Sequence, residues 1–373
     1  MTTMQFAFRT DASLQIGTGH VMRCLTLADA LTERGAYCHF ICREHPGNLI
    51  ELIRSKGHIV HTLPPPAART GSLATEQTAT HPNLAHGHWL GAPQAQDAEA
   101  CAPILAAQRP NWLIVDHYAL EIHWEQALRN CCPHLMVIDD LADRHHQCDL
   151  LLDQNLGRQA VDYESLVPEH CTVLTGPRYA LLRPEFAALR EASLSRRAAP
   201  RLRRLLISMG GVDGPNATSM VLQALQVCSL PSDCEITVVM GSKALWLEQV
   251  QEIAKGMPWP TQVLVNVADM GLLMTNSDLS IGAAGSTSWE RCCLGLPSIV
   301  LVLAENQRFI SSELNRTGAA KTIILEAGTL ASQLKLVIDS YRTPARLRES
   351  AQIAASICDG SGTERVGRIL LGK

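Results

Sequence analysis

The histidine at position 20 has the clearest capacity for chemistry in this sequence. It follows the Gly17-Thr18-Gly19 turn, at the point where an apolar run ends and a helix is predicted to begin. The positive end of a helix disfavours the imidazolium form, so a histidine there stays a free base near neutral pH and could deprotonate water. A helix cap or a buried structural histidine fits the same spacing. A dinucleotide site is disfavoured, because the third glycine of the G-x-G-x-x-G fingerprint would fall at Met22.

A turn of small residues in the second half of the chain is suited to a diphosphate. Gly285-Ser286-Thr287 follows an apolar run and opens a predicted helix, so backbone N–H groups and two hydroxyls gather at the helix start. Glu290 lies about one turn further on, where its carboxylate could bind both hydroxyls of a ribose. Helix capping explains the same pattern without a ligand. A second small turn, Gly210-Gly211, ends another predicted strand and favours the nucleotide-binding interpretation.

Polar residues also follow other predicted strands. Asp116 and Tyr118 end one apolar run. Asn306 and Gln307 follow another, in the second half of the chain. These side chains could hydrogen-bond a sugar or a phosphate, or they could cap the next element. Paired carboxylates such as Asp139-Asp140 also suit Mg²⁺, but no Walker-type lysine accompanies them, so we predict no metal.

Strands and helices alternate along the chain in two successive arrays. This alternation predicts two doubly wound parallel-sheet (Rossmann-like) domains, which suits a length of 373 residues. We expect an N-terminal domain over residues 1–183, a linker over 184–203 and a C-terminal domain over 204–373, whose last helix can pack back on the first domain. The ligand site is expected in the interdomain cleft, at the carboxyl ends of strands. Residues 64–95 show little periodicity and predict a long loop.

Composition excludes several classes of protein. Apolar residues make up 46% of the chain and the net charge is −4, so there is no global basic field for nucleic-acid binding. No apolar run reaches the roughly 20 residues of a membrane span. The N-terminus lacks the basic start and apolar run of a signal peptide, so a cytoplasmic protein is expected. The 13 cysteines are scattered without a C-x-x-C pair, which predicts free thiols rather than a zinc site or disulfides.

Several blocks of sequence resemble one family of enzymes. The first block, from Arg9 to Ala28, contains Asp11-Ala12-Ser13 and Gly17-x-Gly19-His20. It resembles the N-terminal signature of the UDP-2,4-diacetamido-2,4,6-trideoxy-β-L-altropyranose hydrolases of pseudaminic acid synthesis. The resemblance extends over roughly residues 4–320. Further blocks follow in the family's order at Val115–Tyr118, Asp139–Arg144, Asp153–Asn155, Gly176–Phe186, Ser208–Asp213 and Gly282–Arg291.

The resemblance implies a GT-B-like fold, similar to that of the lipid II glycosyltransferase of peptidoglycan synthesis. It implies that the C-terminal domain holds UDP, that the sugar faces the N-terminal domain, and that water activated by His20 is the acceptor. UDP and free 2,4-diacetamido-2,4,6-trideoxy-L-altrose would be released with inversion, without a metal or another cofactor. The sugar would serve pseudaminic acid synthesis and the glycosylation of flagellin or surface polysaccharide. We expect a monomer whose partner is the UDP-sugar.

Motifs and resemblance together give the expected site, with His20 as the catalytic residue. Two alternatives remain open: a GT-B glycosyltransferase that transfers the sugar from UDP to another acceptor, and a non-catalytic nucleotide-sugar-binding protein. The residues expected to bind UDP are Gly210, Gly211, Gly285, Ser286, Thr287 and Glu290. The residues expected to bind the rest of the substrate are Asp11, Gly17, Gly19, Asp116, Tyr118, Arg183, Asn306 and Gln307.

Overall fold

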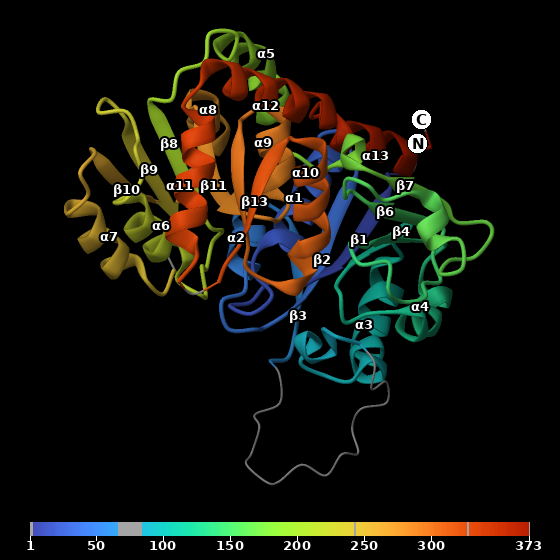
Figure 1. Cartoon of the computed structure of the whole chain (residues 1–373). Coiled ribbons are helices and arrows are strands. Elements are labelled where there is room, and N and C mark those ends of the chain that lie inside the picture. Colours follow the sequence, from blue (N-terminus) through green and yellow to red (C-terminus); the bar gives the residue numbers. More distant parts are fainter. Residues whose placement is uncertain (1–2, 66–83, 242–243, 327, 373) are drawn as a thin grey trace. The chain divides into compact units, whose positions relative to one another are not determined.

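The computed structural model describes residues 3–65, 84–241, 244–326 and 328–372. Residue contacts divide the chain into two units, which are described separately: unit 1 is Met1–Leu181 with Thr363–Lys373, and unit 2 is Leu182–Gly362. Each unit is built on one parallel sheet with helices on its faces (Figure 1). The predicted pair of doubly wound domains is therefore confirmed. Residues 66–83 of the predicted long loop lie outside the described residues.

The sheet of unit 1 has seven strands in the order β3-β2-β1-β4-β5-β6-β7. All neighbouring strands are parallel, and Thr10 at the end of β1 lies opposite Asp116 at the end of β4. Strand order changes direction between β1 and β4, so this sheet has its topological switch point there. The strands are β1 (Gln5–Thr10), β2 (Tyr37–Arg43), β3 (Ile59–Leu63), β4 (Trp112–Asp116), β5 (His134–Ile138), β6 (Leu150–Asp153) and β7 (Thr172–Thr175).

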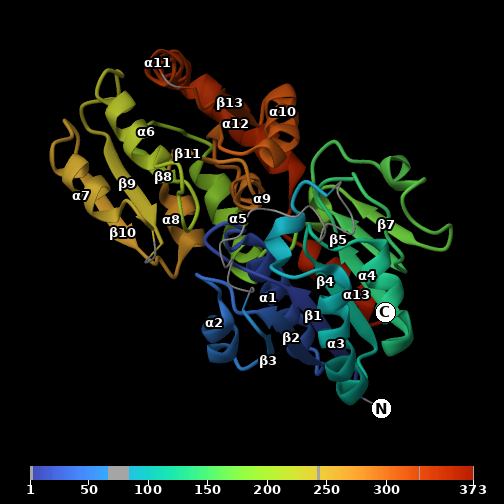
Figure 2. The ribbon, with the colours of Figure 1, turned by 90° about the horizontal axis from the view of Figure 1, so that it is seen from below.

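Apolar side chains cover both faces of this sheet, as expected for buried parallel strands. Phe6 and Phe8 of β1 point to the face that packs against α1 and α13, whereas Ala7 points to the face that packs against α3 and α4. The second pair of helices lies side by side on its face (Figure 2). The helices of unit 1 are α1 (Gly19–Thr32), α2 (Ile50–Ser55), α3 (Gln94–Gln108), α4 (Ile122–Leu128) and α13 (Gly362–Leu370), with short 3₁₀ turns at η1 (Gly87–Leu90), η2 (Arg129–Cys131), η3 (Ala160–Tyr163) and η4 (Pro177–Tyr179).

The sheet of unit 2 has six parallel strands in the order β10-β9-β8-β11-β12-β13, with its switch point between β8 and β11. One apolar cluster joins its strands to α6, α7 and α11. The strands are β8 (Arg204–Ser208), β9 (Glu235–Met240), β10 (Thr261–Val265), β11 (Leu279–Ala283), β12 (Ser298–Val302) and β13 (Ala320–Ile324). The helices are α5 (Pro184–Arg196), α6 (Ala217–Leu225), α7 (Leu247–Lys255), α8 (Met270–Asn276), α9 (Thr287–Cys293), η5 (Glu305–Gln307), α10 (Arg308–Thr317), α11 (Leu330–Tyr341) and α12 (Pro344–Ile357).

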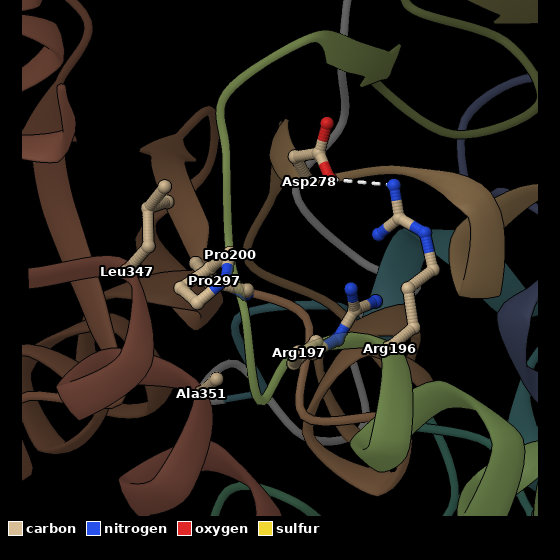
Figure 3. A pocket seen from close by; sticks show the side chains of 7 residues that line it. All are labelled: Arg196, Arg197, Pro200, Asp278, Pro297, Leu347 and Ala351. Atoms are coloured by element: carbon tan, nitrogen blue, oxygen red, sulfur yellow. Dashed lines mark hydrogen bonds and ion pairs between the residues drawn. The ribbon is translucent and has the colours of Figure 1, made fainter. Parts of the chain in front are cut away.

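The segment 184–203, which the sequence assigns to a linker, contains α5 and is held to the rest of unit 2 by the buried Arg197 and the half-buried Arg196. Arg197 donates hydrogen bonds to the carbonyl oxygens of Met274, Ser277 and Leu294 at 2.9–3.0 Å. Arg196 forms an ion pair of 2.5 Å with Asp278 beside a small pocket (Figure 3). Burial and the neighbouring Arg196 lower the pKa of Arg197 to about 9. The arginines that line this pocket therefore attach the end of α5 to unit 2.

The last helix completes the core of unit 1. Val366 and Leu370 of α13 are 0% and 1% exposed and belong to the apolar cluster around β1 and α1.

All 13 cysteines are free, most of them buried. Among the described residues, no helix has both the length and the apolar character that a bilayer span requires.

We expect the Leu370→Ala substitution to lower the free energy of unfolding by about 2–5 kcal/mol, because it leaves a cavity between α13 and the sheet. Urea unfolding followed by far-UV circular dichroism would measure the change. The matched control is Ile369→Ala, since the neighbouring Ile369 is 39% exposed and its truncation should change stability by less than about 0.5 kcal/mol. Equal effects of the two substitutions would contradict the packing of α13.

Candidate active site

Most of the expected site residues follow the strands that flank the switch point of each sheet. In unit 1, the turn with Gly17 and Gly19 follows β1, and Asp116 and Tyr118 end β4 or follow it. The helix after β1 packs on one face of the sheet and the helix after β4 packs on the other, so the two connections diverge to opposite faces, the arrangement at which open α/β sheets commonly bind ligands. In unit 2, Gly210-Gly211 follows β8 and Gly285-Ser286-Thr287 follows β11, the two strands that flank its switch point.

A compact turn fixes the start of α1. The Oγ atom of Ser13 accepts hydrogen bonds from the backbone N–H groups of Gln15 (3.1 Å) and Ile16 (2.9 Å). Ser13 and Gly17 then pair through their backbones, and Gly17 has a φ of +82°, which glycine adopts without strain. Gly19 is the first residue of α1, so His20 stands in the first turn of that helix.

His20 is held by a buried carboxylate. Its Nδ1 lies 2.6 Å from Oδ1 of Asp116, which has no exposed surface, while the His20 side chain keeps 10% of its surface exposed. Arg23 binds the same carboxylate through both oxygens at 2.7 Å. Burial disfavours the charged form of Asp116, but the charge of Arg23 and the hydrogen bonds from Arg23 and His20 outweigh it, so the pKa lies well below its usual range. Because an ionised carboxylate can only accept, Nδ1 carries the proton and the lone pair of His20 is on Nε2.

Tyr118 packs against the same histidine. The two rings meet edge to face at 4.5 Å between centroids. The hydroxyl of Tyr118 donates to Asp140 at 2.7 Å, and Asp140 also pairs with Nη1 of Arg23 at 2.7 Å. Burial and the nearby Asp140 raise the pKa of Tyr118 well above its usual value, so the phenol stays protonated. Tyr118 therefore positions His20 and is not a proton carrier at neutral pH.

Asp11 is enclosed by the protein. Its carboxylate pairs with Arg9 at 2.8 Å, accepts the backbone N–H of Arg43 at 2.7 Å and lies 3.3 Å from Nε2 of His117. Burial alone would raise the pKa of Asp11, but Arg9 outweighs it and holds the pKa well below its usual range. The side chain has no exposed surface and joins the ends of β1, β2 and β4. Asp11 therefore holds these strand ends together and does not itself reach the surface.

Four residues near His20 were not in the expected site. Arg23 and Asp140 form the charged network described above, and His86 and Trp89 contact the ring of Tyr118. The spacing of Arg23, three residues after His20 on a helix, could have revealed it, because such residues share a face. The segment with His86 and Trp89 lies in the predicted loop, where no periodicity indicates its place.

The turn after β11 in unit 2 has a buried cation at its base. Arg291 of α9 is 2% exposed and donates through Nη2 to the carbonyl of Ala283 (2.8 Å) and to Oγ of Ser288 (2.9 Å). A side chain at Gly282 would overlap the Arg291 guanidinium, so a glycine is required there. Burial lowers the pKa of Arg291 to about 10, which still leaves a cation at neutral pH. A positive charge next to Gly285-Ser286-Thr287 favours an anionic ligand at this turn.

Glu290 and Arg183, two of the expected binding residues, lie close together in unit 2. Nη2 of Arg183 is 3.8 Å from Oε1 of Glu290, and Arg183 also pairs with Glu185 at 2.9 Å. Burial raises the pKa of Glu290 to about 7 against the opposing effect of Arg183. Hydrogen-bond donors such as hydroxyl groups would stabilise the charged form of this carboxylate.

The remaining expected residues of unit 2 lie in the turns after β8 and β12. Gly210 has a φ of +92°, and Asp213 caps α6 by accepting the N–H groups of Ala217 and Thr218 at 2.8 and 2.9 Å. Gln307 folds back to accept the N–H of Leu303 at 2.9 Å, so it stabilises its own turn after β12. Asn306 stands beside it in η5, one strand away from the switch point.

No group of three or more His, Cys, Asp or Glu side chains that could hold a metal ion occurs in the described part of the chain.

Comparisons with known proteins agree with this architecture. No family model matches the chain. It is 28% identical over 84% of its length to the UDP-2,4-diacetamido-2,4,6-trideoxy-β-L-altropyranose hydrolase of Campylobacter jejuni, and covers 97% of that protein. It is also 25% identical over 82% of its length to an uncharacterised protein of Methanocaldococcus jannaschii, and 28% identical over 53% of its length to the spore coat polysaccharide biosynthesis protein SpsG of Bacillus subtilis. The chain spans only 57% and 58% of these last two relatives.

Solved structures show the same fold. The structure of MurG from Acinetobacter baumannii matches with a TM-score of 0.69 at 15% identity, with all of both chains covered. The calicheamicin glycosyltransferase CalG4 matches with a TM-score of 0.60 at 13% identity, over 100% of this chain and 99% of that one. The expected GT-B-like fold is therefore confirmed, and the chain is a relative of the UDP-2,4-diacetamido-2,4,6-trideoxy-β-L-altropyranose hydrolase.

Proposed function

We propose that this chain hydrolyses UDP-2,4-diacetamido-2,4,6-trideoxy-β-L-altropyranose to UDP and free 2,4-diacetamido-2,4,6-trideoxy-L-altrose. The observation that carries the proposal is the His20–Asp116 pair at the switch point of unit 1. Its 2.6 Å contact fixes the proton on Nδ1, and Nε2 has no hydrogen-bond partner among the described residues. The likeness to the Campylobacter jejuni hydrolase supports this substrate, and the GT-B-like fold supports a nucleotide sugar in general.

In the proposed reaction, Nε2 of His20 takes a proton from a water molecule as the water oxygen attacks the anomeric carbon. The new C–O bond forms while the bond from that carbon to the diphosphate breaks, and the bonding pair leaves with UDP. Attack on the face opposite UDP inverts the anomeric carbon. Because UDP is a good leaving group, no strong general acid is needed. General-base assistance of this kind accelerates reactions by about 10²–10⁴-fold.

Asp116 and Arg23 would keep His20 ready for this step. As His20 gains a proton, the buried carboxylate of Asp116 stabilises the imidazolium. Arg23 occupies both oxygens of Asp116, so the carboxylate stays ionised and cannot rotate away from the ring. His20 then returns its proton to solvent water.

We assign UDP to unit 2. The backbone N–H groups of Gly285-Ser286-Thr287 and the charge of Arg291 would hold the diphosphate without a metal. Gly210-Gly211 allows close approach of the ligand to the backbone, and Glu290 would accept hydrogen bonds from the ribose hydroxyls. Arg183 orients Glu290, whereas Asn306 and Gln307 border the diphosphate or the sugar.

The product would enter pseudaminic acid synthesis and the glycosylation of flagellin or surface polysaccharide. The name of the Bacillus subtilis relative, a spore coat polysaccharide biosynthesis protein, supports a role in surface polysaccharide. The cytoplasmic location and the monomeric state remain predictions from the sequence.

We expect the protein to release UDP from this UDP-sugar with water as the only acceptor, at the same rate in EDTA, as followed by ³¹P and ¹H NMR. Early ¹H spectra should show the inverted anomer of the sugar before mutarotation.

His20→Ala should bind the UDP-sugar with little change in Kd but lose at least about 99% of turnover, since the base is removed. UDP release at the wild-type rate by this variant would exclude His20 as the base. Release that needs an added alcohol would indicate a glycosyltransferase, and binding without release would indicate a non-catalytic protein.

We expect Asp116→Asn to lower kcat by about 10²–10⁴-fold with a small change in KM, because an amide can donate to Nδ1 and favour the wrong tautomer of His20. Steady-state UDP release would measure both constants. The matched control is Asp143→Asn, since Asp143 is 45% exposed and should leave kcat unchanged. A kcat within threefold of the wild type for Asp116→Asn would contradict the role of this pair.

We expect Glu290→Gln to stabilise the protein at pH 8 but not at pH 4. The pKa of Glu290 is raised from 4.5 to about 7, so its favourable contribution to stability is present below about pH 4.5 and is lost as the pH rises through about 7. The neutral amide avoids this loss, which is worth roughly 2–3 kcal/mol at pH 8. Thermal unfolding at both pH values would measure the effect. The control is Glu305→Gln, because the side chain of Glu305 is 84% exposed.

Calorimetry should show weaker UDP binding by Glu290→Gln; unchanged affinity would remove Glu290 from the nucleotide site.

A further inference from the structure

Three aromatic rings contact one another beside His20. Trp89 stacks on Tyr118 with centroids 5.7 Å apart and planes inclined by 23°. The ring of His86 lies 4.3 Å from Trp89 and 5.4 Å from Tyr118. Tyr118 in turn meets His20 at 4.5 Å. We call His86, Trp89 and Tyr118 the aromatic patch.

Two residues next to Trp89, Leu90 and His88, hold this segment in place. Leu90, the last residue of η1, is 1% exposed and belongs to the apolar core beneath α3. On the other side, Nε2 of His88 lies 2.8 Å from the side-chain nitrogen of Gln15, in the turn that precedes α1. Trp89 therefore belongs to the same local structure as the turn that positions His20.

Trp89 is the member of the patch with unused capacity for binding. Tyr118 is 7% exposed and its hydroxyl is bound to Asp140, whereas Trp89 is only half-buried. The indole N–H of Trp89 has no acceptor among the described residues. A half-buried indole offers an apolar face and one hydrogen-bond donor at its edge.

The patch is also uncharged at neutral pH. Burial lowers the pKa of His86, so its imidazole is neutral, and the phenol of Tyr118 stays protonated. A neutral aromatic surface favours C–H and methyl groups, and its N–H donor matches an amide carbonyl. A sugar that carries only hydroxyls has no methyl group to pack on the ring face, and its hydroxyl groups would lose hydration there.

We propose that Trp89 is a specificity-determining residue that recognises the deoxy and acetamido substituents of the sugar. This inference rests on the proposed function. The face of the indole packs against a methyl group of the substrate, and Nε1 donates a hydrogen bond to an acetamido carbonyl. His86 supports the indole from one side, and Tyr118 links it to His20.

The test compares the wild type with Trp89→Ala and Trp89→Phe. Trp89→Ala should lower kcat/KM for the 2,4-diacetamido-2,4,6-trideoxy UDP-sugar by about 10- to 100-fold, which corresponds to one or two lost contacts. Trp89→Phe keeps an aromatic face but not the N–H, so its loss should be smaller. The inhibition constants of UDP and UDP-glucose, whose glucose carries only hydroxyls, should change by less than about threefold. A fall in affinity for UDP-glucose equal to the loss for the substrate would mean that Trp89 only maintains the structure, and would overturn the proposal.

The matched control is Trp112→Ala. Trp112 is also half-buried and also stacks on a histidine, His134, at 4.8 Å, but it starts β4 at the opposite end of the strand from Asp116. This variant should keep the wild-type kcat/KM for the substrate. Thermal unfolding of all variants would show whether any loss follows from lower stability.

A second measurement does not depend on turnover. In the complex of His20→Ala with the substrate, the ring current of Trp89 should shift the ¹H resonance of a sugar methyl group upfield, and the shift should vanish when Trp89→Ala is added. If the wild type hydrolyses the substrate but Trp89→Ala matches it and the methyl shift persists, this inference fails while the proposed function stands. If the wild type releases no UDP from the substrate, the proposed function itself fails.

Discussion

The buried carboxylate of Asp116 is the feature on which the site of unit 1 depends. A lone carboxylate without exposed surface would be costly, and removal of its partner cation would leave that cost uncompensated. Arg23 neutralises it with two hydrogen bonds, and Asp140 in turn balances Arg23. One oxygen of Asp116 also accepts a hydrogen bond from Nδ1 of His20. The charges thus fix the tautomer of the imidazole, and the tautomer fixes which nitrogen is available to a ligand.

Both units place their polar residues by the same rule of topology. In each sheet, the strand order reverses beside the first strand of the unit, and the two connections at that point diverge to opposite sides. Unit 1 places a histidine and a carboxylate there, whereas unit 2 places glycine turns and a buried arginine. The same architecture therefore holds a histidine–carboxylate pair in one unit and small-residue turns beside a buried cation in the other, and the difference lies in a few side chains.

Local pattern predicted much of the fold but not the long-range pairings of the site. The apolar run at Trp112–Asp116 predicted a buried strand, and the structure has β4 there. The 96-residue separation between His20 and Asp116 is closed only because β1 and β4 are neighbours, which no local pattern indicates. Trp89 was missed because its segment has no periodicity. Segment 184–203 was predicted to be a linker, and no local pattern indicates that its Arg197 is held by carbonyls of unit 2 that are distant in the sequence.

The place of α13 has a consequence for how the protein is made. Its residues complete the core of unit 1, although unit 2 lies between them and the rest of that unit in the sequence. Domains generally fold as units during synthesis, starting from the N-terminus. Here the ribosome supplies every residue of unit 2 before it supplies the last helix of unit 1. The second unit can therefore finish folding first, and the unit that holds His20 becomes complete only after unit 2 has been synthesised.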